Sequence, residues 1–186
     1  MSDGSVHLPN SRRFAKSTEF LARAEAVIPL GSQTFSKSKT QLPVGAAPLF
    51  AQRGEGPYVY DVDGNKLIDF VCSLGAITMG HGDPEVTEAA CAQVRDGVVF
   101  SLAHPIETIV AEKIVDMIPC AEKVRFGKNG SDATTGCIRV ARAFTGREHV
   151  AMCGYHGWQD WSIGTSARDL GVPAATKALT HTFPYN

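Results

Sequence analysis

The feature that most restricts the fold is the alternation of helix-like and strand-like segments after residue 80. Helical spacing of apolar residues and short apolar runs predict six segments, namely helices over 84–96, 105–118 and 131–144 and strands over 123–126, 149–153 and 178–183. This order is typical of an α/β fold with a mainly parallel sheet and flanking helices. Ligands of such sheets bind at the carboxyl ends of the strands. The loops 127–132 and 154–161 are therefore the candidates for a functional site.

The first 71 residues have a different pattern. Residues 14–27 are amphipathic and predict a helix, after which glycine and proline recur as far as Pro57 and favour loops over packed elements. Tyr58–Val71 predicts a β-hairpin, because Asp63-Gly64-Asn65 supplies residues that tolerate the positive φ of a tight turn. We therefore expect residues 1–71 to form an N-terminal arm, a helix and a β-hairpin.

Composition argues against nucleic-acid binding, a membrane-spanning segment and secretion. The 18 basic and 19 acidic residues give a net charge of −1, without the basic excess of a typical nucleic-acid binder. No apolar run approaches the roughly 20 residues of a membrane-spanning helix, and the start of the chain lacks the apolar core of a secretory signal. The cysteines are isolated, without a C-x-x-C pair: Cys72, Cys91, Cys120, Cys137 and Cys153. We expect a cytoplasmic protein with reduced cysteines and no membrane or nucleic-acid partner.

The first candidate loop, within FGKNGSDAT at residues 126–134, combines glycines with the start of a helix. Unpaired N–H groups and the positive end of the helix dipole suit a phosphate, and Ser131 and Thr134 add hydroxyls. The apolar residues of this helix predict one buried face. Alternatively, Ser131 is only an N-cap and Gly130 only a turn residue. The segment is not a P-loop, because no G-x-x-x-x-G-K-[ST] occurs.

The second candidate loop, GYHGWQDW at residues 154–161, is rich in aromatic residues. An aromatic ring there can stack on a planar cofactor, and Gly157 allows close approach. Alternatively, Tyr155, Trp158 and Trp161 are core or interface residues, and His156 is a structural histidine.

Other chemistries find less support in the sequence. There is no H-E-x-x-H motif, and the six histidines are scattered without ligand spacing, so we expect no metal site. No G-x-S-x-G nucleophile motif occurs. Asp61, Asp63 and Asp69 flank the hairpin and are interpreted as turn or solvent residues rather than a catalytic pair.

Four blocks, in the order DVDGN-x-x-I-D-F, GHGDPEV, RFGKNGSDAT and GYHGW, resemble the class III, fold type I pyridoxal-phosphate aminotransferases. Glutamate-1-semialdehyde aminomutases and similar aminotransferases are the nearest in pattern, and the resemblance runs from about residue 28 to residue 186. It implies that residues 72–186 form the first half of the family's large cofactor-binding domain, which is incomplete here. It also implies pyridoxal phosphate as cofactor, a small-molecule amino donor and acceptor, and a homodimer in the full-length enzyme.

Residues that match the family's cofactor-binding motifs are Gly130, Ser131, Asp132, Tyr155, His156 and Gly157. The resemblance implies that Gly130 and Ser131 bind the cofactor phosphate and that Tyr155 stacks on its pyridine ring. Asp132 replaces the usual glutamate, and Trp158 stands where the aminomutases have histidine or a smaller residue. Ser73–Gly75 aligns with a segment that helps to form the substrate pocket.

The lysine that forms a Schiff base with the cofactor has no counterpart in this chain. In the family this lysine, and the aspartate that pairs with the pyridinium nitrogen, lie downstream of the Tyr-His-Gly element. None of the eight lysines here occupies that position. We therefore expect an aminotransferase or aminomutase represented by its N-terminal part and inactive alone. Two alternatives stay open, a non-catalytic binding or assembly module and a small α/β binder of phosphate ligands.

Overall fold

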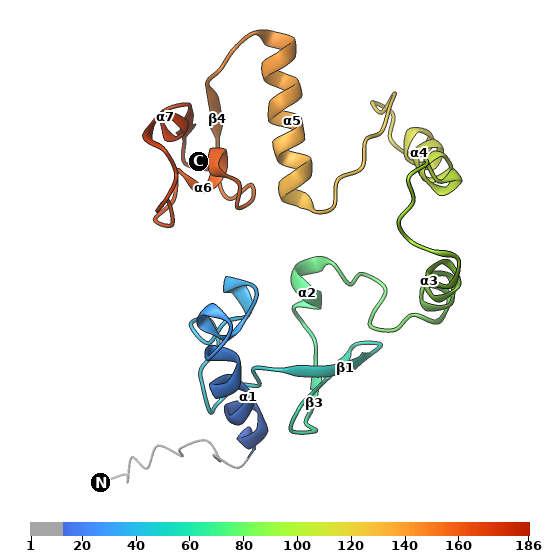
Figure 1. Ribbon diagram of the computed structural model, residues 1–186, viewed down its shortest axis with the longest axis vertical. Coiled ribbons are helices and arrows are strands. Elements are labelled where there is room, and N and C mark those ends of the chain that lie inside the picture. Colours follow the sequence, from blue (N-terminus) through green and yellow to red (C-terminus); the bar gives the residue numbers. More distant parts are fainter. Residues whose placement is uncertain (1–12) are drawn as a thin grey trace. The chain divides into compact units, whose positions relative to one another are not determined.

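The computed structural model describes residues 13–186 as two compact units, one ending at Phe100 and the other spanning Ser101–Asn186 (Figure 1). We call these unit 1 and unit 2. Residues 1–12 lie outside the described residues. The expectation about a secretory signal and part of the predicted N-terminal arm concern these residues. The boundary expected between residues 71 and 72 concerns a larger domain and stays a prediction.

Unit 1 is built around a three-stranded antiparallel sheet in the order β1-β2-β3. Its elements are α1 (Ala15–Glu25), the 3-10 turns η1 (Pro29–Gly31) and η2 (Phe35–Lys37), β1 (Ala51–Glu55), β2 (Tyr58–Asp61), β3 (Lys66–Ile68), α2 (Cys72–Gly75) and α3 (Pro84–Asp96). The predicted first helix and the β2–β3 hairpin are confirmed. The prediction of loops as far as Pro57 is wrong over β1, which pairs with β2. Its sequence, AQRGE, has no apolar alternation, so the pairing with β2 rather than local pattern creates this strand.

The hairpin turn is held by the carboxylate of Asp61, which is 2% exposed. Its Oδ1 accepts hydrogen bonds from the backbone N–H groups of Asp63 (3.0 Å) and Asn65 (2.7 Å), and its Oδ2 accepts one from Nδ2 of Asn65 (2.7 Å). The carboxylate of Asp63 in turn accepts hydrogen bonds from the N–H groups of Lys16 (2.7 Å) and Ser17 (2.9 Å) at the start of α1. Asp61 and Asp63 therefore act as turn residues, as predicted, and Asp63 also attaches α1 to the sheet.

Asp69 anchors a left-handed turn that follows β3. Cys72, Ser73 and Leu74 have φ values of 48°, 52° and 59°, a conformation that costs non-glycine residues roughly 1–2 kcal/mol each. Oδ1 of Asp69 accepts hydrogen bonds from the N–H groups of Val71 (3.0 Å) and Cys72 (2.9 Å), and Oδ2 lies 2.8 Å from Nε2 of His81 in a further hydrogen bond. The His81 hydrogen bond, together with these N–H groups, lowers the pKa of Asp69.

The third helix of unit 1 begins and ends as its sequence predicts. Oδ1 of Asp83 accepts a hydrogen bond from the N–H of Val86 (3.0 Å), Pro84 occupies the first turn, and the helix ends before Gly97.

Unit 2 contains four of the predicted elements, together with two short helices that the sequence does not predict. The four are α4 (Pro105–Met117), α5 (Gly130–Thr145), β4 (Val150–Met152) and β5 (Thr180–Thr182), and the two short helices are α6 (Asp160–Ile163) and α7 (Ala174–Lys177). β4 and β5 are parallel, with Val150 opposite Thr180 and Met152 opposite Thr182, which confirms these two predicted strands. The strand predicted over 123–126 is wrong, because that segment pairs with no other strand of the described chain.

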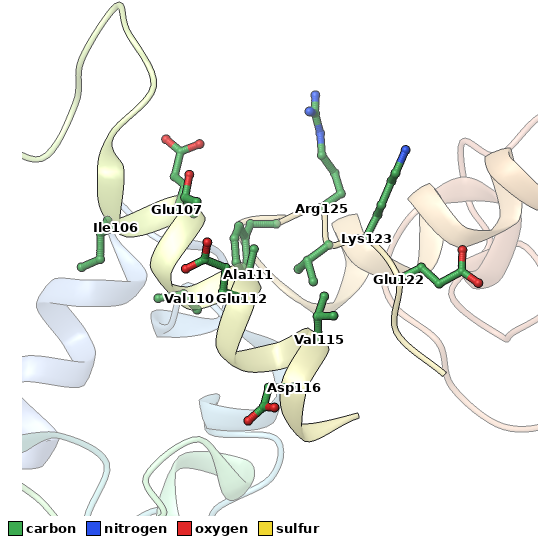
Figure 2. Close-up of a pocket in the computed structure, with 13 residues that line it drawn as sticks. Ile106, Glu107, Val110, Ala111, Glu112, Val115, Asp116, Glu122, Lys123 and Arg125 are labelled. Atoms are coloured by element: carbon green, nitrogen blue, oxygen red, sulfur yellow. The ribbon is translucent and has the colours of Figure 1, made fainter. Parts of the chain in front are cut away.

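The apolar faces of the helices are largely uncovered. Within residues 13–186, the buried hydrophobic residues are Phe14, Leu21, Met152 and Trp161, whereas Val140 and Phe144 of α5 are 68% and 91% exposed. The predicted burial of one face of α5 is therefore wrong for this chain, because a two-stranded sheet with three residues in each strand is too small to cover it. A hollow of about 1410 Å³ is lined by α4 and the segment 122–126. In Figure 2, Val115 of α4 lies on the side of the helix that faces the segment carrying Lys123 and Arg125.

Among residues 13–186, no helix combines the length and apolar character that crossing a bilayer requires.

We expect Asp61→Ala to loosen the β2–β3 hairpin. The substitution removes the acceptor of three hydrogen bonds, and even one bond to a charged group contributes about 1.5–3 kcal/mol. The free energy of local opening over residues 58–68 should therefore fall by at least about 2 kcal/mol, measured by native-state hydrogen exchange. Asp96→Ala, at an exposed aspartate of the same unit, is the matched control and should leave exchange unchanged. Equal protection in the two variants would show that the turn does not depend on Asp61.

We expect the left-handed turn to weaken in acid. Because the pKa of Asp69 is lower in the folded chain than in the unfolded one, its contribution is present above the unfolded pKa and is lost as the pH falls through the folded pKa, below about pH 4. Hydrogen exchange over residues 69–81, corrected for the intrinsic rate at each pH, should show this loss in the wild-type chain. In Asp69→Asn the protection should be weaker at neutral pH and lack the acid-dependent step. A step of the same size in both chains would refute the assignment.

Candidate functional site

The two loops singled out in the sequence meet in unit 2 at the start of α5. The helix is capped by Asn129, whose side chain accepts a hydrogen bond from the N–H of Asp132 (3.0 Å). The cap is thus Asn129, and the alternative that Ser131 serves only as N-cap is wrong. Ser131 instead lies half-buried in the first turn of α5, where its side chain faces the second loop.

Ser131 contacts the second loop closely. Its Oγ accepts a hydrogen bond from the backbone N–H of Trp158 (3.3 Å). Gly157 packs directly against it, because a Cβ atom at residue 157 would lie 2.6 Å from Ser131 Oγ and 2.9 Å from its Cβ. Gly157 also has a φ of +118°, which side chains rarely tolerate. Glycine is therefore required here for the loop to reach the helix.

Two further hydrogen bonds fix the second loop on α5. Oγ1 of Thr134 donates to the carbonyl oxygen of His156 (2.8 Å), and Nε1 of Trp161 donates to Oγ1 of Thr135 (2.9 Å). The hydroxyl of Thr134 belongs to the predicted helix start, whereas no sequence pattern indicates Thr135, since its contact with Trp161 joins residues 26 positions apart. The partner of Thr134 is a backbone carbonyl, which no side-chain motif indicates.

The aromatic residues of the second loop have different environments. Trp161 is 8% exposed, so the interpretation as a core residue is correct for this side chain. Tyr155 and Trp158 are 73% and 65% exposed. Nδ1 of His156 lies 3.3 Å from the carbonyl oxygen of Gly154, and its ring is 6.3 Å from that of Trp161. Tyr155 and Trp158 therefore offer flat apolar faces that a ligand can cover.

The start of α5 has the groups that an anion requires. Asn129 accepts from Asp132, and the N–H groups of Gly130 and Ser131 have no acceptor within the described chain. These N–H groups stand at the positive end of the helix dipole. Nothing lies within 4 Å of the position that a Cβ of Gly130 would occupy, so the space beside this residue is open. Asp132 is half-buried, and its Cβ lies near Gly127.

The remaining features do not belong to this arrangement. None of the residues that line the 1410 Å³ hollow comes from the two loops. Ser73–Gly75 lies in unit 1 within the left-handed turn, and its role at a substrate pocket stays a prediction.

The known proteins that the chain resembles include aminotransferases and aminomutases. The chain is 36% identical to 3-aminobutyryl-CoA aminotransferase of Cloacimonas acidaminovorans, with 94% of the chain and 41% of the relative covered. It is 37% identical to glutamate-1-semialdehyde 2,1-aminomutase of Symbiobacterium thermophilum, with coverage of 94% and 42%. Among solved structures, it is similar to the FumI protein of a Sphingopyxis species in its PLP internal aldimine form, with a TM-score of 0.83, 32% identity and coverage of 92% and 41%.

The matches also show which part of the relatives this chain covers. The chain spans about two fifths of the length of the curated relatives that it matches, and it corresponds to their N-terminal part. The class-III aminotransferase family matches residues 41–185, which include both loops of the site and most of the described chain. The expected family is thereby confirmed, and the chain belongs to the class-III aminotransferases.

Proposed function

We propose that this chain forms the phosphate-binding and ring-binding part of a pyridoxal-phosphate-dependent aminotransferase or aminomutase. The observation that carries the proposal is the close contact between Ser131 and Gly157, which brings an anion-binding helix start and an aromatic loop together. A phosphate and a planar ring are the two parts of the cofactor that need such groups. The similarity to a solved structure in a PLP form supports this choice of ligand.

The residues of α5 fit the cofactor phosphate. The N–H groups of Gly130 and Ser131 are the donors that the described chain leaves without an acceptor, and phosphate binding at such helix starts is common. The hydroxyl of Ser131 accepts from Trp158 and still has its own hydrogen to donate, because a hydroxyl is both donor and acceptor. We assign phosphate binding to Gly130 and Ser131, with Asp132 shaping the first turn beside them.

The second loop fits the cofactor ring. Tyr155 presents an exposed aromatic face, and the hydrogen bond from Thr134 to the carbonyl of His156 fixes the backbone next to it. Stacking against such a ring orients a planar ligand and excludes water from one side of it. We assign ring stacking to Tyr155, and positioning of the loop to His156 and Gly157.

Pyridoxal phosphate, when bound, acts as an electron sink for bonds at the amino-bearing carbon of a substrate. The residues of this chain hold its phosphate and orient its ring, whereas none of the eight lysines occupies the family's Schiff-base position. We therefore propose that the 186-residue chain alone does not turn over substrate. The complete enzyme would take a small-molecule amino donor and acceptor, act in the cytoplasm and form a homodimer.

We expect pyridoxamine 5′-phosphate to bind the chain more tightly than pyridoxamine. The amine form is the better probe because it does not react with surface lysines as the aldehyde does. Ser131→Ala should reduce the affinity for the phosphorylated compound by roughly 10- to 100-fold, the range expected for a hydrogen bond to a charged group. It should weaken pyridoxamine binding far less, because only the loop contact with Trp158 is lost for that compound. Tyr155→Ala should weaken the binding of both compounds. Isothermal titration calorimetry measures each affinity.

Matched controls separate these effects from general damage. Ser101→Ala removes an exposed serine hydroxyl of unit 2, and Tyr185→Ala removes an exposed tyrosine ring, and both should bind like the wild-type chain. Equal binding of the two compounds by the wild-type chain would contradict the phosphate site. Binding of ATP in preference to pyridoxamine 5′-phosphate would favour the alternative of a general binder of phosphate ligands.

We expect the chain with added pyridoxal phosphate to produce no keto acid from L-alanine or L-glutamate beyond the rate of pyridoxal phosphate alone. The physical reason is that no lysine stands where the family's reaction needs one. A coupled dehydrogenase assay detects the keto acid. Turnover above the protein-free background would overturn the assignment of inactivity without affecting the binding proposal.

A further inference from the structure

We propose that His149 and His181 form a binding site for a divalent d-block cation of the Ni²⁺ or Cu²⁺ type. Nδ1 of His149 lies 2.9 Å from Nε2 of His181, and the rings are nearly parallel, with centroids 5.1 Å apart and an interplanar angle of 20°. Both histidines are exposed, so an ion in solution can reach the two nitrogens. The site is separate from the proposed cofactor site and does not depend on it.

The parallel strands hold the two rings together. His149 directly precedes β4, and His181 is the middle residue of β5, where it lies opposite Ala151. The residues are 32 positions apart in the sequence. The linear spacing of the histidines predicts no metal site, but linear spacing does not detect a pair that strand pairing brings together. His149 precedes β4, whereas the loop 154–161 follows it, so the pair and the loop lie at opposite ends of this strand.

The distance between the nitrogens suits one kind of coordination. Metal–imidazole bonds are about 2.0–2.1 Å long, so two nitrogens bound about 90° apart lie roughly 2.9 Å from each other, whereas a tetrahedral angle separates them by roughly 3.4 Å. The observed 2.9 Å is the separation of the hydrogen-bonded pair, and it equals the separation of neighbouring positions around a square-planar or octahedral ion. Both rings must turn for their lone pairs to converge on the ion, but the nitrogens need not move apart. Imidazole ligands in such geometries are typical of Cu²⁺ and Ni²⁺, and Zn²⁺ prefers the tetrahedral arrangement.

Binding requires a rearrangement of one proton. In the hydrogen-bonded pair, one of the two facing nitrogens carries the hydrogen and the other accepts it. When the donor ring changes tautomer, its proton moves to its other nitrogen, and both facing nitrogens then present lone pairs. No proton is released and no other group changes its charge, so the ion replaces a hydrogen bond with two metal–nitrogen bonds.

The site has two protein ligands, and water completes the coordination. Over residues 13–186, no group of three or more His, Cys, Asp or Glu side chains is placed to hold a metal ion. The affinity is therefore modest, and the consequence is mechanical, because the ion joins β4 to β5. A ligand that binds only the folded state stabilises it by linkage, so Ni²⁺ should stabilise the strand pair.

The test is a titration of the untagged 186-residue chain with Ni²⁺ in a thiol-free reducing buffer, followed by calorimetry. We expect one Ni²⁺ per chain, bound more tightly than Zn²⁺. His149→Asn and His181→Asn should each weaken binding by roughly tenfold or more, since even the loss of a group that only supports a ligand costs about 10- to 100-fold. His104→Asn is the matched control, because asparagine can replace His104 as the cap of α4. It should bind Ni²⁺ like the wild-type chain.

Hydrogen exchange provides a second measurement that does not depend on calorimetric heats. Ni²⁺ should increase the protection of residues 149–153 and 178–183 in the wild-type chain and in His104→Asn, and not in His149→Asn or His181→Asn. Equal Ni²⁺ affinity in the double variant His149→Asn/His181→Asn would overturn the proposal, because binding would then come from other groups such as the cysteines. Tighter binding of Zn²⁺ than of Ni²⁺ would overturn the assigned geometry.

Discussion

The parallel pairing of β4 and β5 determines where the chemistry of unit 2 lies. Three residues on each strand pair in register, and this short ladder fixes the direction in which the chain leaves β4. At the carboxyl end, the chain enters the loop 154–161, which reaches the first turn of α5. At the other end of β4, the same pairing brings His149 beside His181. Both proposed sites thus depend on one ladder, although they use opposite ends of the first strand.

The contact between the loop and α5 depends on residues with complementary sizes and hydrogen-bonding capacities. Only glycine fits against Ser131 at the φ of residue 157. The hydroxyl hydrogen of Thr134 is already used within the chain, because it faces the carbonyl oxygens of His156 and Ser131. Ser131 differs, since its oxygen accepts from Trp158 while its hydrogen remains available. Structural and ligand-binding roles are therefore compatible in Ser131, which explains how one serine can position the loop and also bind a phosphate.

The parts of the structure that the sequence predicts well are those with local causes. Asp83 caps α3 through an N–H three residues away, and Asp63-Gly64-Asn65 forms its turn through hydrogen bonds to Asp61. Both signals lie within a few positions. The failures involve distant partners: β1 exists because β2 pairs with it, and the segment 123–126 has strand-like residues but no described partner. Sequence motifs indicate the residues of the candidate cofactor site. They do not indicate the contacts made by Thr134 and Thr135 or the cap at Asn129, which only the folded chain shows.

The exposed faces of the helices bear on how well the site can bind a ligand. α5 supplies the N–H groups of the proposed phosphate site, yet Val140 and Phe144 on the same helix are 68% and 91% exposed. Burying a large apolar side chain contributes about 1.5–3 kcal/mol, so covering this face would hold α5 much more firmly. A helix that is held mainly by its first turn must be ordered when the ligand binds, and that ordering reduces affinity. Covering the apolar face of α5 would therefore strengthen the phosphate site indirectly, by fixing the helix whose start binds the anion.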